Sequence, residues 1–208
     1  MLIDHVIFAV PDLNAAAKEL VNVHGLASVP GGRHLAWGTA NRIVPMGENY
    51  LEMVSVVDAK IAALSSFGRW VMAAGGGLQP LGWAVRTHDL GAVSGRLGLS
   101  AVEGSRRSSD GRILEWVLAG VEEAVAEPNL PFFIQWGPQT PLPGRMPVVH
   151  PVGESRIARV HVTGEVKRMR SWLAGSDLPV ASHPGPPAVT AIDIVSAGRS
   201  WVLSGRPT

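Results

Sequence analysis

The sequence predicts an α+β fold built from repeated strand-helix-strand-strand-strand modules, and three observations lead to this prediction. First, residues 1–57 read in the order strand, helix, strand, strand, strand. Second, residues 78–137 repeat this order imperfectly when Asp12-Leu13 is aligned with Asp89-Leu90, a period of about 80 residues. Third, 46% of the 208 residues are hydrophobic and 17% are charged, which is typical of a folded chain with a buried core.

The strands of the first module are predicted from the alternation of their side chains between two faces. Residues 2–10 and 49–57 both alternate between two faces, as the side chains of a strand do. Between them a helix begins after Asp12, whose side chain can cap it, and runs towards Gly25. Residues 30–45 contain glycines where the backbone turns, followed by short strand-like runs. Together these segments predict one small sheet with one helix.

The remaining segments follow from the same signals. Residues 58–77 connect the modules, and most of this stretch is predicted to be one helix. The second module contains a hairpin that turns at Asp110-Gly111. Residues 138–154 are proline-rich and predict a linker loop, while residues 155–208 predict a strand, a helix and two strands around a rigid loop at 182–187. We therefore expect residues 1–208 to form a single unit, with the last segment packed on the module pair.

Composition and charge exclude several classes of protein. A net charge of +1 gives no reason to expect nucleic acid or an anionic membrane as a partner. The absence of cysteine excludes disulfides, thiolate catalysis and Cys-ligated zinc. Asp4 and His5 interrupt the N-terminal apolar run, so it predicts neither a signal peptide nor a membrane span. We expect a cytoplasmic protein for which a homodimer is possible.

Glu52 and His5 are the polar groups that call for an explanation. Glu52 shares a strand face with Tyr50 and Val54, and an unpaired carboxylate there would cost several kcal/mol. The obvious partner is His5, which shares a face of the first strand with apolar residues. An imidazole and a carboxylate on two strands could be half of a metal site or an inert buried pair.

Several segments within roughly the first 140 residues also share their order and spacing with one known superfamily. They are Leu2-Ile3-Asp4-His5-Val6 with Pro11-Asp12-Leu13, Gly32-Arg33-His34 to Gly38-Thr39-Ala40-Asn41, Tyr50-Leu51-Glu52, Ser66-Phe67-Gly68-Arg69-Trp70, and Gly82-Trp83-Ala84 before Asp89-Leu90. In these segments the chain resembles the glyoxalase-like branch of the vicinal-oxygen-chelate superfamily, also called the glyoxalase/bleomycin-resistance/dioxygenase superfamily.

The resemblance implies a fold and a metal site. The fold is a cupped mixed β-sheet of βαβββ modules with flanking helices. The metal ligands would be His5 and Glu52, and imidazole with carboxylate suits a divalent Zn, Fe, Mn or Ni ion. In our alignment Gly82 and Gln135 replace the second module's ligands. A third strong ligand must then come from the remaining histidines, or the site holds no metal; the candidates are His34, His150 and His161, of which we take His150 as the prediction.

The resemblance also implies a function. The leading prediction is a metal-dependent isomerase, lyase or dioxygenase that acts on a small oxygenated molecule, with Glu52 and Tyr50 as catalytic residues. The alternative is a metal-free protein that binds or sequesters a small molecule in the same cavity, as bleomycin-resistance members do. This alternative follows from the missing second-module ligands. In either case we expect substrate contacts from Arg33, His34, Trp37, Asn41 and Gln135.

Overall fold

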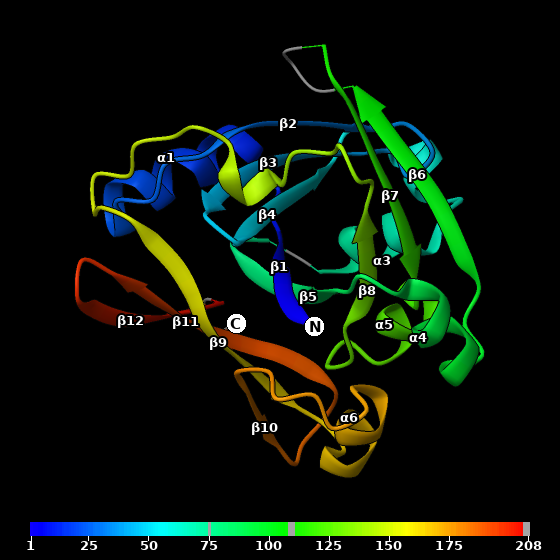
Figure 1. Ribbon diagram of the computed structural model, residues 1–208. Coiled ribbons are helices and arrows are strands. Elements are labelled where there is room, and N and C mark those ends of the chain that lie inside the picture. The colour runs from blue at the N-terminus through cyan, green and yellow to red at the C-terminus, as the bar shows by residue number, and fades with distance from the viewer. Residues whose placement is uncertain (75, 108–110, 206–208) are drawn as a thin grey trace.

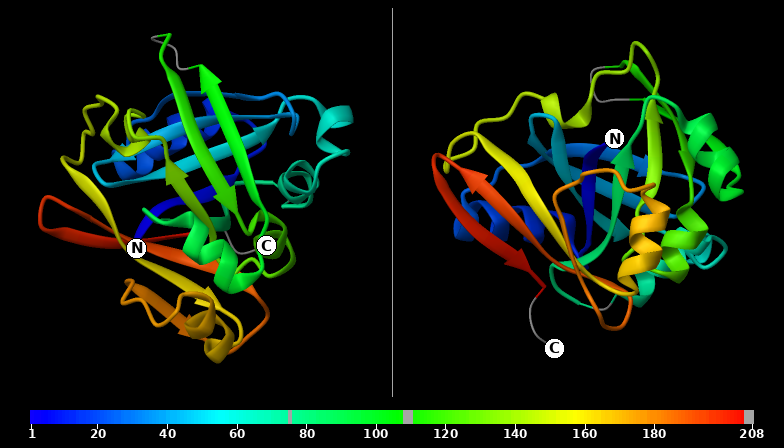
Figure 2. Two further views of the ribbon diagram at one scale, coloured as in Figure 1. Left: turned by 45° about the vertical axis from the view of Figure 1, so that its right-hand side comes forward. Right: turned by 60° about the horizontal axis from the view of Figure 1, so that its bottom comes forward.

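The computed structural model describes residues 1–74, 76–107 and 111–205, whose strands form two sheets (Figure 1). The larger sheet is mixed and contains eight strands, in the order β2 (Val29–His34), β3 (Thr39–Met46), β4 (Asn49–Val56), β1 (Leu2–Ala9), β5 (Gln79–Arg86), β8 (Phe132–Trp136), β7 (Ile113–Ala119) and β6 (Ala101–Arg107). It curves so strongly that its two edge strands, β2 and β6, contact each other (Figure 2). The predicted α+β class and cupped sheet are confirmed.

The two halves of this sheet have the same internal pairing. In the first half β1 runs parallel to β4, and in the second half β5 runs parallel to β8. Antiparallel pairing of β1 with β5 joins the halves at the centre. A helix follows the first strand of each half, α1 (Leu13–His24) and α4 (Leu90–Leu97). Their predicted caps, Asp12 and Asp89, accept backbone hydrogen bonds at the helix starts.

Two helical segments differ from the prediction. Residues 58–72 form two short helices, α2 (Ala59–Ala62) and α3 (Ser66–Ala73), because the Ser65 side chain accepts a hydrogen bond from the Gly68 N–H and starts a new helix. A further helix, α5 (Val121–Ala126), stands between β7 and β8 and was not predicted. Residue 110, in the predicted hairpin turn, lies outside the described residues.

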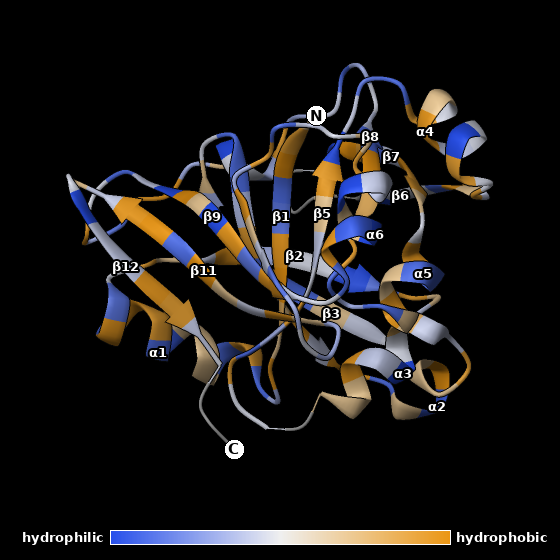
Figure 3. Cartoon of the chain, turned by 90° about the horizontal axis from the view of Figure 1, so that it is seen from below, coloured by the Kyte–Doolittle hydropathy of each residue, from blue (hydrophilic) through white to orange (hydrophobic). Residues whose placement is uncertain are grey.

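The second sheet contains four strands, β10 (Val180–His183), β9 (Ser155–Thr163), β11 (Ala188–Ser196) and β12 (Arg199–Ser204), with α6 (Val166–Trp172) beside it. The first residues of the predicted 182–187 loop belong instead to β10, which pairs with β9 in parallel. Hydrophobic and hydrophilic residues alternate along β9 and β11 (Figure 3). Their apolar side packs on the eight-stranded sheet, which covers that face of both sheets.

A large core and a small core fill the molecule. The large core lies between the two sheets and contains Trp83, which is fully buried and donates its indole N–H to the Asn129 carbonyl at 2.8 Å. The smaller core lies on the concave face of the eight-stranded sheet, under α3 and α5. Its apolar side chains continue into the cavity described below. Within the described residues, no helix is long and apolar enough to cross a membrane.

Candidate functional site

His5 lies on the concave face of β1 with both ring nitrogens directed at carboxylates. Its Nδ1 is 2.7 Å from Asp4 Oδ1, and its Nε2 is 3.5 Å from Glu52 Oε2. Since a carboxylate only accepts, the short contact with Asp4 places the proton of a neutral ring on Nδ1. The other ring nitrogen, Nε2, then faces Glu52 and the cavity.

Asp4 is a site residue that strand alternation alone misses. Alternation would point it away from His5, but the register between β1 and β5 shifts at this point, so that Ile3 pairs with Val85 and His5 with Ala84. Such a bulge re-aims a side chain. The buried Asp4 carboxylate also accepts a hydrogen bond from Trp136 Nε1 at 3.0 Å. Asp4 therefore holds the His5 ring in one orientation, as carboxylates behind functional histidines do.

Glu52 lies on β4 beside β1 and is held from the other side by Asn41 of β3. The Asn41 amide donates to Glu52 Oε1 at 2.5 Å, and its carbonyl oxygen accepts from the Gly32 N–H at 2.7 Å. With both ends of the amide engaged, the direction of the Asn41 side chain is fixed. Glu52 and Asn41 are both buried, so bulk water has little access to the carboxylate. The Asn41 amide supplies a hydrogen bond in place of water.

His34 and Tyr50 complete the polar side of the cavity. His34 Nδ1 lies 2.9 Å from the Thr39 hydroxyl, and its Nε2 is 3.9 Å from Glu52 Oε1. Burial lowers the pKa of His34 below its ordinary value, although the Glu52 charge opposes this, so the ring is neutral at pH 7. Tyr50 stacks on the His5 ring with centroids 4.6 Å apart. Burial, with the charges of Asp4 and Glu52, raises the pKa of Tyr50 well above its ordinary value. Tyr50 therefore acts as a donor.

These polar groups face a cavity of about 60 Å³ with mainly aromatic walls. The first-module residues His5, His34, Asn41, Tyr50 and Glu52 all line it. A mostly apolar cavity with a few convergent polar groups is the usual form of a small-molecule site. The aromatic walls are formed by Trp37, Phe67, Trp116, Phe132 and Trp136, and one cation, Arg106, also lines the cavity.

Three predicted site residues lie elsewhere. Arg33 follows Gly32 on β2 but is exposed and does not line the cavity. Gln135 accepts a hydrogen bond from the Leu90 N–H at the start of α4, on the other face of β8. His150 uses both ring nitrogens on backbone groups, accepting from the Ala27 N–H at 3.0 Å and contacting the Pro45 carbonyl at 2.6 Å. The structure thus places His34 beside Glu52, and it places neither Gln135 nor His150 there.

The His150 geometry predicts a role in stability. Replacing His150 with alanine removes the partners of the Ala27 N–H and the Pro45 carbonyl, and should lower the free energy of unfolding by about 1–3 kcal/mol. Urea unfolding measures this change, and a Zn²⁺ titration of the same variant should match the wild-type protein. Unchanged stability together with weakened Zn²⁺ binding would instead make His150 a metal ligand.

The register corrects our alignment of the second module. Ile7 pairs with Glu52 in the first module, and Ala84, its counterpart 77 residues later, pairs with Phe132. Phe132, and not Gln135, therefore stands in the place of Glu52. At the position equivalent to His5, a Cβ atom on Gly82 would collide with the Trp70 ring. Aromatic rings thus occupy both ligand positions of the second module, one from Phe132 and one from Trp70 of α3.

The cavity offers a divalent ion only part of a coordination shell. The 3.5 Å between His5 Nε2 and Glu52 Oε2 suits two donors of one ion at about 2.1 Å each. His34 Nε2 is the next donor, 3.9 Å from the other Glu52 oxygen. Among the residues that the structure describes, no group of three or more His, Asp or Glu side chains is arranged to hold a metal ion. The residues present do not form a complete metal centre.

Comparison with known proteins gives one family and a set of distant structural neighbours. The family model described as a glyoxalase-like domain matches residues 3–176. The crystal structure of a hypothetical protein from Staphylococcus aureus superimposes with a TM-score of 0.64 at 17% identity, covering 97% of this chain and 85% of that chain. A search of curated proteins gives no match.

Several other neighbours are methylmalonyl-CoA epimerases. The enzyme from Mycobacterium tuberculosis has a TM-score of 0.44 at 22% identity, covering 64% of this chain and 85% of that chain. A variant from Streptomyces coelicolor in complex with 2-nitronate-propionyl-CoA has a TM-score of 0.47 at 18% identity, covering 65% and 96%. The structural likenesses therefore bear on the fold alone.

Proposed function

This chain belongs to the glyoxalase-like domain family, and from that premise we propose that it is an enzyme that moves a proton on a small oxygenated molecule. Isomerisation and lyase reactions are the classes concerned. The observation that carries the proposal is the pair formed by His5 Nε2 and Glu52 Oε2, 3.5 Å apart at the wall of one cavity. Each member has a buried partner behind it, Asp4 or Asn41, which is how catalytic side chains are kept in position.

The proposed roles follow from the positions of the groups. Glu52 or His5 takes a proton from a carbon next to a carbonyl, and the same pair returns it at a different position or face. Tyr50 stays protonated, and its one O–H donor pairs with the Asp4 carboxylate, so Tyr50 would have to turn from Asp4 to donate to the oxygen on which negative charge develops. The walls are mainly apolar, which strengthens these electrostatic contacts.

The predicted divalent metal ion has one available binding position in the proposed site. If an ion binds, His5 Nε2 and Glu52 are the donors that the cavity offers it, and it would supply a Lewis acid for a substrate oxygen. Phe132 and the Trp70 ring of α3 occupy the matching positions, and neither can coordinate a metal ion. No step of the proposed proton transfer passes through a metal ion.

Deuterium exchange tests the proposal without a known substrate. The protein is incubated in D₂O with a panel of small enolisable carbonyl compounds, neutral and acidic, and proton NMR follows the carbon-bound protons. We expect at least one compound to exchange, with or without EDTA, and the His5→Asn variant to exchange it about 100-fold more slowly. This variant retains a donor for Asp4 but loses the ring nitrogen that faces Glu52. Absence of exchange across the panel, or an unaffected variant, contradicts the proposal.

A second candidate function is a binding protein that sequesters a flat small molecule. The observation that favours it is Phe132, which stands where the second module would carry a ligand and adds to the aromatic lining of the cavity. Flat molecules gain affinity from stacking on such walls. Saturable quenching of tryptophan fluorescence by a compound that undergoes no exchange and no conversion would identify this function.

A further inference from the structure

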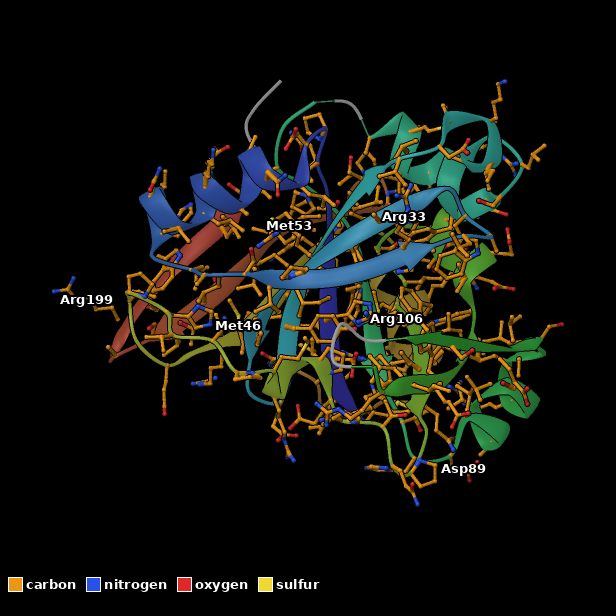
Figure 4. All side chains as sticks on the ribbon, turned by 90° about the horizontal axis from the view of Figure 1, so that it is seen from above. Arg33, Met46, Met53, Asp89, Arg106 and Arg199 are labelled. Carbon is orange, nitrogen blue, oxygen red and sulfur yellow. The ribbon has the colours of Figure 1, made fainter. Side chains whose placement is uncertain are left out.

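Arg106 lines the cavity from an edge strand of the sheet, whereas His5 and Glu52 line it from the inner strands β1 and β4. It lies on edge strand β6, in the part of the hairpin that approaches β2, whereas Arg33 lies on β2 itself (Figure 4). One guanidinium nitrogen of Arg106 donates to the Gly31 carbonyl at 2.7 Å. The absence of a side chain at Gly32 makes room for this approach, because a Cβ there would lie 3.0 Å from the same nitrogen. The guanidinium is therefore held at the cavity wall.

The charge of Arg106 has no counterion in the described part of the chain. Neither an aspartate nor a glutamate among those residues forms an ion pair with it, while the Gly31 carbonyl takes only one of its five N–H donors. Burial is the main cause of the pKa shifts of His34 and Tyr50, and the positive charge of Arg106 adds to the lowering for His34 and opposes the rise for Tyr50. A part-buried guanidinium at the wall of a cavity is a preferred partner for a carboxylate.

We infer that Arg106 binds the carboxylate of the ligand, so that the substrate class is a small, flat, largely apolar carboxylic acid. The carboxylate would pair with the guanidinium, and the apolar body would lie between aromatic side chains such as Trp37, Trp116 and Phe132. The carbon to be deprotonated would then face His5 and Glu52. This inference rests on the proposed function, because it takes the same cavity as the active site.

The hydrogen bond to Gly31 gives Arg106 a structural role as well, since it links the edge strands β2 and β6. A purely structural role and a ligand-binding role differ in one measurable respect. Loss of the link would weaken the binding of charged and neutral ligands alike. Loss of the carboxylate partner would weaken only the binding of the charged ligand.

The experiment compares benzoate with benzamide, which have nearly the same shape but differ in charge. Both are titrated into the full chain while the fluorescence of the cavity tryptophans is recorded. We expect the wild-type protein to bind benzoate about tenfold more tightly than benzamide or better. Arg106→Gln should remove this preference and leave benzamide binding unchanged, and Arg106→Lys should restore part of it. Arg33→Gln, which removes an exposed arginine from the neighbouring strand, should keep the full preference.

Three outcomes overturn the inference. They are equal binding of the two probes by the wild-type protein, absence of saturable binding of either, and an Arg106→Gln variant that is folded by circular dichroism yet keeps the preference. The proposed function fails separately. If the benzoate preference depends on Arg106 but deuterium exchange is absent, the chain binds acids without proton transfer. If exchange depends on His5 while the preference survives in Arg106→Gln, the function stands and Arg106 only links the strands.

Discussion

Replacing Glu52 with glutamine is expected to slow turnover of an exchanging compound by about 10²–10⁴-fold, the usual contribution of general acid-base catalysis. The substitution preserves the shape of the side chain and an oxygen that can accept the Asn41 hydrogen bond. It removes the negative charge that faces His5 Nε2. The fold and the cavity should therefore survive, so that the loss appears in kcat and little in KM. Deuterium exchange under saturating compound measures this change.

A matched control uses a carboxylate outside the site. Glu154 is exposed in the loop before β9 and does not line the cavity, so Glu154→Gln changes the net charge by the same amount. Its exchange rate should equal that of the wild-type protein. An equal rate for Glu52→Gln would show that this carboxylate is an inert member of a buried pair, which is the alternative that the sequence left open.

Much of the site's first-module side follows from one physical rule. Side chains alternate along a strand, so His5, Glu52 and Tyr50 were expected on apolar faces of two strands, and the parallel pairing of β1 with β4 brings those faces together. Asn41 was expected to contact the substrate, and it lines the cavity and donates a hydrogen bond to Glu52. These residues lie on neighbouring strands of one module, so the alternation of side chains along each strand is enough to predict them.

The other residues of the site could not be predicted, because their positions depend on strand register and on contacts between distant segments. Asp4 reaches His5 through a bulge, which shifts the register by one residue and leaves no clear trace in the sequence. Arg106 reaches the cavity because the curved sheet brings β2 and β6 together, a contact between residues 75 positions apart. Helix α5 stands between β7 and β8, where the first module has only a tight turn, and it was not predicted; Gln135 was assigned the place of Phe132. The paired glycines before Arg33 were the one sequence signal for this close approach.

Replacing Gly31 with alanine is therefore expected to damage stability and site together. A Cβ at this position would collide with the side-chain oxygen of Asn41 and come within 3.0 Å of its carbonyl oxygen. Asn41 is buried, and moving it breaks its hydrogen bonds to the Gly32 N–H and to Glu52. Forcing an extra carbon into such a site costs typically about 1–3 kcal/mol, and an unpaired buried carboxylate oxygen adds to that cost. Urea unfolding measures the loss, and exchange should fall towards the rate of Glu52→Gln.

Gly95 provides the comparison, because it lies exposed in α4, where an added Cβ atom would meet nothing within 4 Å. Alanine there removes the entropy cost of a helical glycine and should stabilise the protein by about 0.5–1 kcal/mol without altering exchange. The two substitutions add the same methyl group. A difference in the sign of the stability change therefore reflects the different surroundings of the two glycines. Equal stability for both variants would mean that β2 can shift away from Asn41, and the support of Glu52 by Asn41 would then contribute little to the site.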